Sequence, residues 1–172
     1  MHSIGIKTFT LRFLVISLSP TITIFSQEIL KQNYILKDGL PSNETYHIIT
    51  DKKGYIWIAT DAGICKYDGY KFKVFGEKDG LPESVVLKLY EDRKGRIWFS
   101  ILSSKLGYIF ENKIHLIIDC IPHNTKYIPY VYCFHVDNKD NLWIGTIQTG
   151  SIFKIPYPYK TKKQIEKKKV QS

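Results

Sequence analysis

The chain has 172 residues, of which 44% are hydrophobic and 14% aromatic, and this content is sufficient for the core of one globular domain. The formal net charge is +9, but the excess lies at the two ends, and residues 28–159 carry 17 basic against 15 acidic side chains. This near-neutral central region argues against a nucleic-acid-binding face. Three cysteines are too few, and odd in number, for a disulfide framework.

Residues 1–26 are predicted to form a secretory signal peptide. Lys7 and Arg12 precede an apolar stretch from Phe13 to Phe25, and Ser26 offers a small side chain at a cleavage point. An uncleaved membrane anchor and a buried strand are the alternatives, although the scattered serines and threonines make this segment a poor membrane span. We therefore expect an exported protein.

Three tryptophans recur at separations of 41 and 45 residues, and each follows an aspartate by six positions. The pairs are Asp51 with Trp57, Asp92 with Trp98, and Asp137 with Trp143. A period of this length is typical of propeller blades and of helical arrays. No segment has a sustained apolar stripe with helical spacing, so helical repeats are disfavoured.

The first unit divides into four short strands separated by turn residues. These strands are rich in aromatic and β-branched side chains and cover "TYHIITD", "YIWIAT", "ICKY" and "YKFKVF". The pair Asp68-Gly69 is expected to form a two-residue hairpin turn, because glycine reaches positive φ at little cost. In the second unit this place is held by Glu111-Asn112, and Asn also tolerates that conformation. At the first turn of each unit, Gly54 and Gly95 are replaced by Asp140 in the third.

The strand around each tryptophan is apolar at alternate positions on both sides, which predicts a strand that is covered on two faces. A small residue follows each tryptophan by two positions, as expected where sheets approach closely: Ala59, Ser100 and Gly145. We expect each tryptophan to pack between neighbouring blades rather than stack on a ligand. The predicted structural anchors of the repeat are Asp51, Trp57, Gly63, Asp92, Trp98, Asp137, Trp143 and Gly150.

The segments "GYIWIATDAGICKYDGYKF" and "DNLWIGT", and the sequence "KDGLP" at residues 37–41 and 78–82, resemble the two-component regulator propeller repeat. The resemblance covers roughly residues 37–155. It implies the periplasmic sensor region of bacterial histidine kinases, including hybrid kinases that respond to polysaccharide breakdown products. Such repeats also occur in chains without a kinase.

The predicted fold is all-β, a partial β-propeller of about three four-stranded antiparallel blades. The predicted segments are an N-terminal strand or linker (27–36), blade 1 (37–77), blade 2 (78–118), blade 3 with an irregular start (119–158) and a basic disordered tail (159–172). A closed propeller typically needs four to eight blades. We therefore expect one face of the first blade and one of the third to stay bare, and the chain to associate with itself or with further blades.

The cysteines and histidines give only weak indications of a site. Cys65 lies in an apolar strand and is expected to be a small core residue, and His47 and His115 are expected on strand surfaces. A disulfide between Cys120 and Cys133 is one alternative for an exported protein. A zinc site formed by Cys120, His123, Cys133 and His135 is another, but these spacings match no common zinc module. We expect no metal and no cofactor.

The sequence contains no Gly-x-Ser-x-Gly elbow, no phosphate-binding glycine loop and no His-Glu-x-x-His motif. The predicted function is a non-catalytic ligand-sensing or structural fragment of a periplasmic propeller, and the alternative is a propeller-scaffold polysaccharide lyase or glycosidase. The expected partners are an oligosaccharide ligand, the remaining propeller blades and a histidine kinase module of a longer chain, with no nucleic acid.

Overall fold

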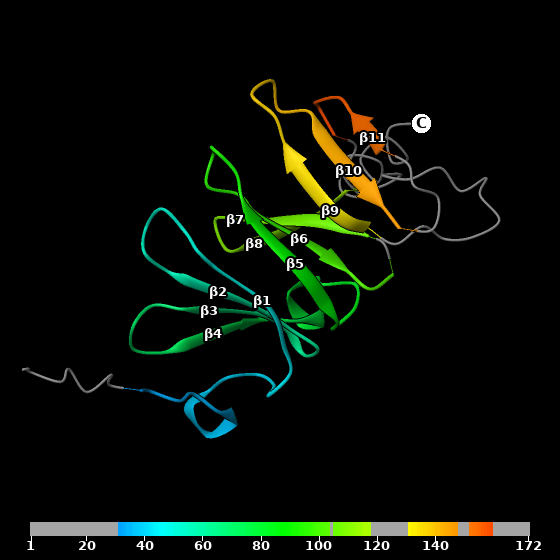
Figure 1. Ribbon diagram of the computed structural model, residues 1–172. Coiled ribbons are helices and arrows are strands. Elements are labelled where there is room, and N and C mark those ends of the chain that lie inside the picture. Colours follow the sequence, from blue (N-terminus) through cyan, green and yellow to red (C-terminus); the bar gives the residue numbers. More distant parts are fainter. Residues whose placement is uncertain (1–30, 104, 118–130, 148–151, 160–172) are drawn as a thin grey trace, which may run out of the picture. The chain divides into compact units, whose positions relative to one another are not determined.

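The computed structural model describes residues 31–103, 105–117, 131–147 and 152–159 of the chain. In these ranges the backbone forms three antiparallel sheets in which strands consecutive in sequence are neighbours (Figure 1). Among the described residues, no helix has the length and apolar character needed to cross a membrane. The all-β, partial-propeller prediction is confirmed.

The first sheet, blade 1, contains β1 (Thr45–Thr50), β2 (Ile56–Thr60), β3 (Gly63–Tyr67) and β4 (Phe72–Phe75). Blade 2 contains β5 (Val86–Glu91), β6 (Ile97–Ile101), β7 (Leu106–Phe110) and β8 (Lys113–Ile117). Blade 3 contains β9 (Val131–Val136), β10 (Leu142–Thr146) and β11 (Ile152–Ile155), which are three strands within the described residues. Two short 3₁₀ turns, η1 (Leu36–Asp38) and η2 (Glu77–Asp79), precede blades 1 and 2.

The blades bury their side chains in two clusters that each join one blade to the next. We call the side of a blade that carries its tryptophan the Trp face, and the other side the opposite face. The Trp face of blade 1 packs against the opposite face of blade 2 through Trp57, Ala59, Ile64, Phe75, Ile97, Phe99, Ile101 and Ile109. The Trp face of blade 2 packs in the same way against blade 3 through Trp98, Leu106, Leu142 and Ile144. Each interface therefore repeats the same pairing of faces.

The two "KDGLP" segments form equivalent wedges. In each, a 3₁₀ turn ends at a glycine with positive φ, Gly39 at 101° and Gly80 at 99°, and the next leucine is buried. Leu81 lies in the cluster between blades 1 and 2. Leu40 packs on Ile58 of the opposite face of blade 1. The prediction of a bare face on blade 1 is therefore only partly correct, because this wedge covers part of it while Ile48 stays 59% exposed.

The N-terminal segment 27–36 was predicted as a strand or a linker. Residues 31–44, which include the described part of it, form η1 and irregular backbone, so the strand alternative is not found there. Residues 1–30 and 160–172 lie outside the described ranges, so the signal peptide and most of the basic tail stay predictions. Tyr159, predicted as the first residue of the tail, is buried in the cluster with Trp98.

Positive φ angles occur where the sequence predicts them at the first turn of each unit. Gly54, Gly95 and Asp140 have φ of 84°, 74° and 61°. Glu111 and Asn112 have φ of 49° and 59° and connect Phe110 to its strand partner Lys113, which makes the expected two-residue hairpin.

The predicted two-residue hairpin at Asp68-Gly69 is wrong. Tyr67 pairs with Phe72, so the loop contains the four residues 68–71. The carboxylate Oδ1 of Asp68 accepts hydrogen bonds of 2.9 Å from the N–H groups of Tyr70 and Lys71, which stabilises the longer loop.

Gly63 and Gly145 are among the glycines at points of close approach. Gly63 has a φ of 114°, and a Cβ at this position would lie 2.5 Å from the carbonyl oxygen of Phe75. A Cβ at Gly145 would lie 2.6 Å from Sγ of Cys133, its partner on the neighbouring strand of the same blade, so this close approach is within one sheet and not between stacked sheets as predicted. Gly150 lies outside the described residues.

Candidate functional site

Asp51 explains the fixed distance between aspartate and tryptophan. One carboxylate oxygen, Oδ1, accepts hydrogen bonds of 2.9 Å from the N–H groups of Lys53 and Tyr55. The other, Oδ2, accepts a hydrogen bond of 2.8 Å from Nε1 of Trp57. One side chain thus holds the β1–β2 turn and orients the indole on the following strand. We call this arrangement the Asp–Trp clamp.

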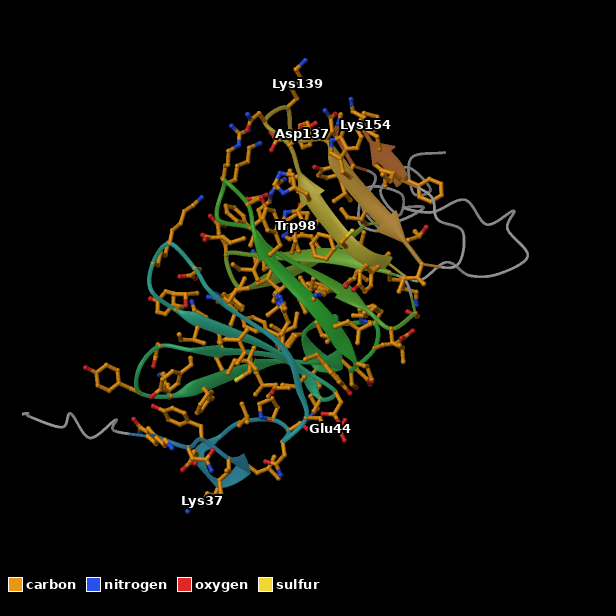
Figure 2. The ribbon with its side chains drawn as sticks, viewed as in Figure 1. Lys37, Glu44, Trp98, Asp137, Lys139 and Lys154 are labelled. Carbon is orange, nitrogen blue, oxygen red and sulfur yellow. The ribbon has the colours of Figure 1, made fainter. Side chains whose placement is uncertain are left out.

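The clamp recurs in blades 2 and 3, with Asp92 and Asp137 as acceptors. Asp92 accepts from the N–H groups of Lys94 and Arg96 at 2.8 and 3.0 Å and from Nε1 of Trp98 at 2.8 Å. Asp137 accepts from Lys139 N and Asn141 N, both at 2.8 Å, and from Trp143 Nε1 at 2.9 Å. Figure 2 labels Trp98 on β6 and Asp137 at the β9–β10 turn. The sequence predicts the pairs but not the hydrogen bond between them, for which the constant spacing of six residues is the signal.

The clamp of blade 2 contains an additional buried charge. Arg96 is 6% exposed and forms ion pairs with Asp92 and, through Nη2 at 3.1 Å, with Asp140 of blade 3. Burial by itself would raise the pKa of Asp92, but the hydrogen bonds from Trp98 and Arg96 lower it below its ordinary value. The pKa of Asp137 is also lowered, first by the hydrogen bond from Trp143. These carboxylates are therefore held in the ionised form.

Polar bonds between blades follow the same repeat. Lys52 and Arg93 each come directly after the clamp aspartate of their blade. Lys52 Nζ donates to the carbonyl oxygen of Asp92 at 3.0 Å, and Arg93 Nη2 donates to the carbonyl oxygen of Asn138 at 2.6 Å. A cation at this position thus links the first turn of one blade to the first turn of the next.

The burial of the three tryptophans depends on whether another blade covers them. Trp57 is 4% exposed and Trp98 is fully buried, whereas Trp143 is 38% exposed. The prediction that Trp143 packs between blades is therefore wrong for this chain. No blade among the described residues covers the Trp face of blade 3, as expected, and this face carries Trp143 with its register neighbours Cys133, His135, Gly145, Ile152 and Lys154.

A cleft of about 250 Å³ lies between blades 1 and 2, next to the first turn of each. Blade 1 contributes Asp51, Lys53, Trp57 and Lys66 to its lining. Blade 2 contributes Glu91, Lys94, Gly95, Ile97, Ile109, Phe110, Glu111 and Asn112. The lining of the cleft therefore combines apolar side chains with three lysines and three carboxylates, Asp51, Glu91 and Glu111.

His47 was predicted to lie on a strand surface, but it takes part in a contact between two blades. Its Nδ1 accepts a hydrogen bond of 3.3 Å from the N–H of Leu89, so it links blade 1 to blade 2. Burial, with a contribution from Lys88, lowers the pKa of His47, which favours the neutral form required of an acceptor. His115 stacks on the ring of Tyr108 at 4.8 Å.

Cys65 is fully buried, as predicted, and burial raises the pKa of its thiol to about 12. Cys133 is exposed and shares the Trp face of blade 3 with His135. Cys120 and His123 lie outside the described residues, so the disulfide and zinc alternatives are not tested. Within the described ranges, no three His, Cys, Asp or Glu side chains are grouped as metal ligands.

The three clamps lie within segments that match a family model. The model of the two component regulator propeller matches residues 39–62, 80–101 and 129–148. These segments are two component regulator propeller repeats. Each propeller repeat contains the clamp aspartate, the first turn and the tryptophan strand. The sequence of the chain matches no curated protein.

Solved structures with a similar backbone come from larger proteins. The extracellular domain of a system from B. thetaiotaomicron, described as one component, matches 74% of this chain with 17% identity and a TM-score of 0.55, and this chain covers 18% of that domain. The extracellular domain of a hybrid two component system from the same organism matches 66% with 20% identity and a TM-score of 0.49, and 17% of it is covered. The propeller repeats of this chain therefore span less than a fifth of those domains.

An inactive variant of virginiamycin B lyase from Staphylococcus aureus is also similar in backbone. It matches 69% of this chain with 20% identity and a TM-score of 0.49, and this chain covers 44% of it. Similarity at this level is too low to assign lyase activity to the propeller repeats described here.

Proposed function

We propose that this chain is a non-catalytic, ligand-sensing or structural part of a periplasmic β-propeller in a two-component signalling system. The observation that carries the proposal is the Asp–Trp clamp, repeated three times within segments that match the two component regulator propeller model. In this proposal, ligand binding to the complete propeller is transmitted across the membrane to a histidine kinase module of a longer chain.

The hydrogen bonding of the clamp aspartates supports a structural role for them. Each carboxylate already accepts hydrogen bonds from two backbone N–H groups and an indole N–H, as described for Asp51, Asp92 and Asp137. The depressed pKa values of Asp92 and Asp137 disfavour the protonated form that a general acid needs. The most regularly placed carboxylates of the chain are therefore poor candidates for glycosidase chemistry.

The proposed ligand class is an oligosaccharide released by polysaccharide breakdown. A binding panel of such oligosaccharides, measured by calorimetry on the full chain, tests the proposal together with product chromatography after long incubation. Saturable binding without turnover is expected. Turnover would replace the sensor with the alternative lyase or glycosidase, and absence of binding to every member would overturn the ligand-sensing role of this chain.

The proposed location depends on residues 1–26 acting as an export signal. Mass spectrometry of the protein recovered from a Gram-negative host is expected to give a mature chain that starts near Gln27 and fractionates with periplasmic proteins. Recovery of a chain that still starts at Met1 in the cytoplasm would contradict export.

A further inference from the structure

The three blades use their faces in one direction. At both internal interfaces, the Trp face of one blade packs on the opposite face of the next. Blade 2 therefore has a neighbour on each face. The opposite face of blade 1 and the Trp face of blade 3 have no blade packed on them among the described residues. These two open faces are the two halves of one kind of interface.

The open Trp face keeps the apolar positions of the internal interfaces. In each blade, the small residue two positions after the tryptophan pairs with a large aliphatic residue on the next strand, and these partners are Ile64, Leu106 and Ile152. Ile64 and Leu106 are fully buried, whereas Ile152 is 75% exposed. Blade 3 therefore presents the side chains of an interface without the blade that covers them elsewhere.

The opposite face of blade 1 shows the same difference. Ile48 and Leu89 are equivalent, because each precedes the clamp aspartate of its blade by three residues and pairs with the residue after the tryptophan. Leu89 is 3% exposed, whereas Ile48 is 59% exposed. Val74, at the other end of the same cross-strand row, is 39% exposed. This face therefore has space for a further sheet.

The wedge that contains Leu40 does not take the place of that sheet. Leu81 of the equivalent wedge lies inside the interface between blades 1 and 2, in the same cluster as Trp57. A Trp face therefore packs together with such a wedge and is not excluded by it. Leu40, which packs on Ile58, is a ready component of an interface with another Trp face.

The polar bond between first turns is not repeated at the open end. Lys52 and Arg93 each donate to a carbonyl oxygen of the next blade. The equivalent residue of blade 3, directly after the clamp aspartate, is Asn138, which is uncharged. A contact on the Trp face of blade 3 would therefore depend mainly on apolar packing.

We propose that the Trp face of blade 3 packs on the opposite face of blade 1 in a second copy of this chain, with Ile152 of one copy and Ile48 of the other in the contact. Each copy supplies the half of the interface that its neighbour lacks. A head-to-tail contact of this kind continues from copy to copy and closes into a ring only if the rotation between copies allows it. The inference does not depend on the proposed ligand class, so it stands or falls separately from the oligosaccharide panel.

Two variants of the full chain, each blocked at one end, test the proposal. Ile152→Lys places a charge on the Trp face of blade 3, and Ile48→Lys places one on the opposite face of blade 1, so each variant alone should associate about tenfold more weakly than the parent or less. Mixed together, the two variants still offer one intact face each. Light scattering after size exclusion should then show a one-to-one heterodimer that grows no further.

Leu102→Lys is the matched control, because Leu102 is a 46% exposed aliphatic side chain at the β6–β7 turn of blade 2 and lies on neither open face. It should associate like the parent. Association of the parent should also persist in about 1 M NaCl, where charges are screened beyond about 3 Å. Thermal unfolding checks that each variant folds, and Val74→Lys is a second block of the opposite face of blade 1.

Three results would overturn the proposal. A parent that stays monomeric would exclude the contact. Unchanged self-association of both folded variants, Ile48→Lys and Val74→Lys, would show that the opposite face of blade 1 is not used, as in pairing of two Trp faces. Absence of a heterodimer in the mixture, or dissociation of the parent by salt, would assign the association to another surface.

Discussion

Asp92 and Trp98 are joined by a hydrogen bond of 2.8 Å, and both side chains are buried, with at most 2% exposed. The same bond connects Asp137 to Trp143, where the indole is 38% exposed. The hydrogen bond is thus a property of each repeat, whereas burial of the indole depends on the presence of the next blade.

This difference predicts unequal effects of truncation. Trp98→Ala should lower the free energy of unfolding by about 3–5 kcal/mol, because it removes a large buried ring. Trp143→Ala should cost less than about 1 kcal/mol, because one side of the ring already contacts solvent. Urea unfolding of the two variants measures the difference. Equal costs would show that the Trp face of blade 3 is covered in solution.

The buried ion pair predicts a large effect of a nearly isosteric change. Asp92→Asn places an amide against two donors, Trp98 Nε1 and Arg96, and leaves Arg96 with less compensation for its buried charge. We expect a loss of roughly 3–5 kcal/mol in the free energy of unfolding. Asp68→Asn is the matched control, because its Oδ1 accepts two backbone N–H groups in an exposed loop and asparagine can do the same. A loss of similar size in the control would contradict this account.

The lowered pKa values of Asp92 and Asp137 predict weaker stability in acid. The pKa of each carboxylate is lower in the folded state than the value of about 3.9 in the unfolded state. Its contribution to the free energy of unfolding is therefore complete above the unfolded-state pKa and is lost as the pH falls toward the folded-state pKa. These two groups should therefore leave the urea concentration at the unfolding midpoint nearly constant at pH 5 and above. At pH values under 4, the midpoint should decrease. In Asp92→Asn the acid-dependent decrease should be smaller, and an identical decrease would assign the effect to other carboxylates.

Two glycines with positive φ predict different responses to alanine. Gly63→Ala would place its Cβ 2.5 Å from the carbonyl oxygen of Phe75, whereas Gly54→Ala meets nothing within 4 Å. Gly54→Ala should cost about 1–2 kcal/mol from backbone strain alone. Gly63→Ala should cost about 1–3 kcal/mol more, because the strand pair must also move apart. Thermal unfolding gives the comparison, and equal costs would show that β4 moves aside freely.

The bare Trp face of blade 3 predicts association of the isolated chain. This face exposes apolar side chains, including Trp143 (38% exposed) and Ile152 (75% exposed). Soluble monomers usually avoid such a surface. Light scattering after size exclusion should show oligomers or poor recovery of the full chain. The double variant Trp143→Lys, Ile152→Lys should shift the distribution toward monomer. A stable, monodisperse parent monomer with a cooperative thermal transition would contradict the open-propeller interpretation.

The sequence alone determined the features that depend on neighbouring residues. Positive φ at Gly54, Gly95 and Asp140 and the hairpin at Glu111-Asn112 were predicted because each is set by the backbone preference of one or two residues. The constant spacing between aspartate and tryptophan revealed the repeat, since the clamp closes within six residues. The loop after Asp68 was mispredicted, because its side chain stabilises a four-residue loop that the Asp-Gly pair alone does not indicate.

Only the tertiary structure decided which face of each blade packs against a neighbouring blade. Trp57, Trp98 and Trp143 occupy identical positions in their repeats, yet their burial differs because burial depends on the blade that follows in space. Likewise, the cleft between blades 1 and 2 is lined by Lys66 of blade 1 and by Ile109 and Asn112 of blade 2, which lie more than forty residues away in the sequence. Local hydrogen bonds fix the blade, whereas contacts between distant segments create the surfaces on which binding depends.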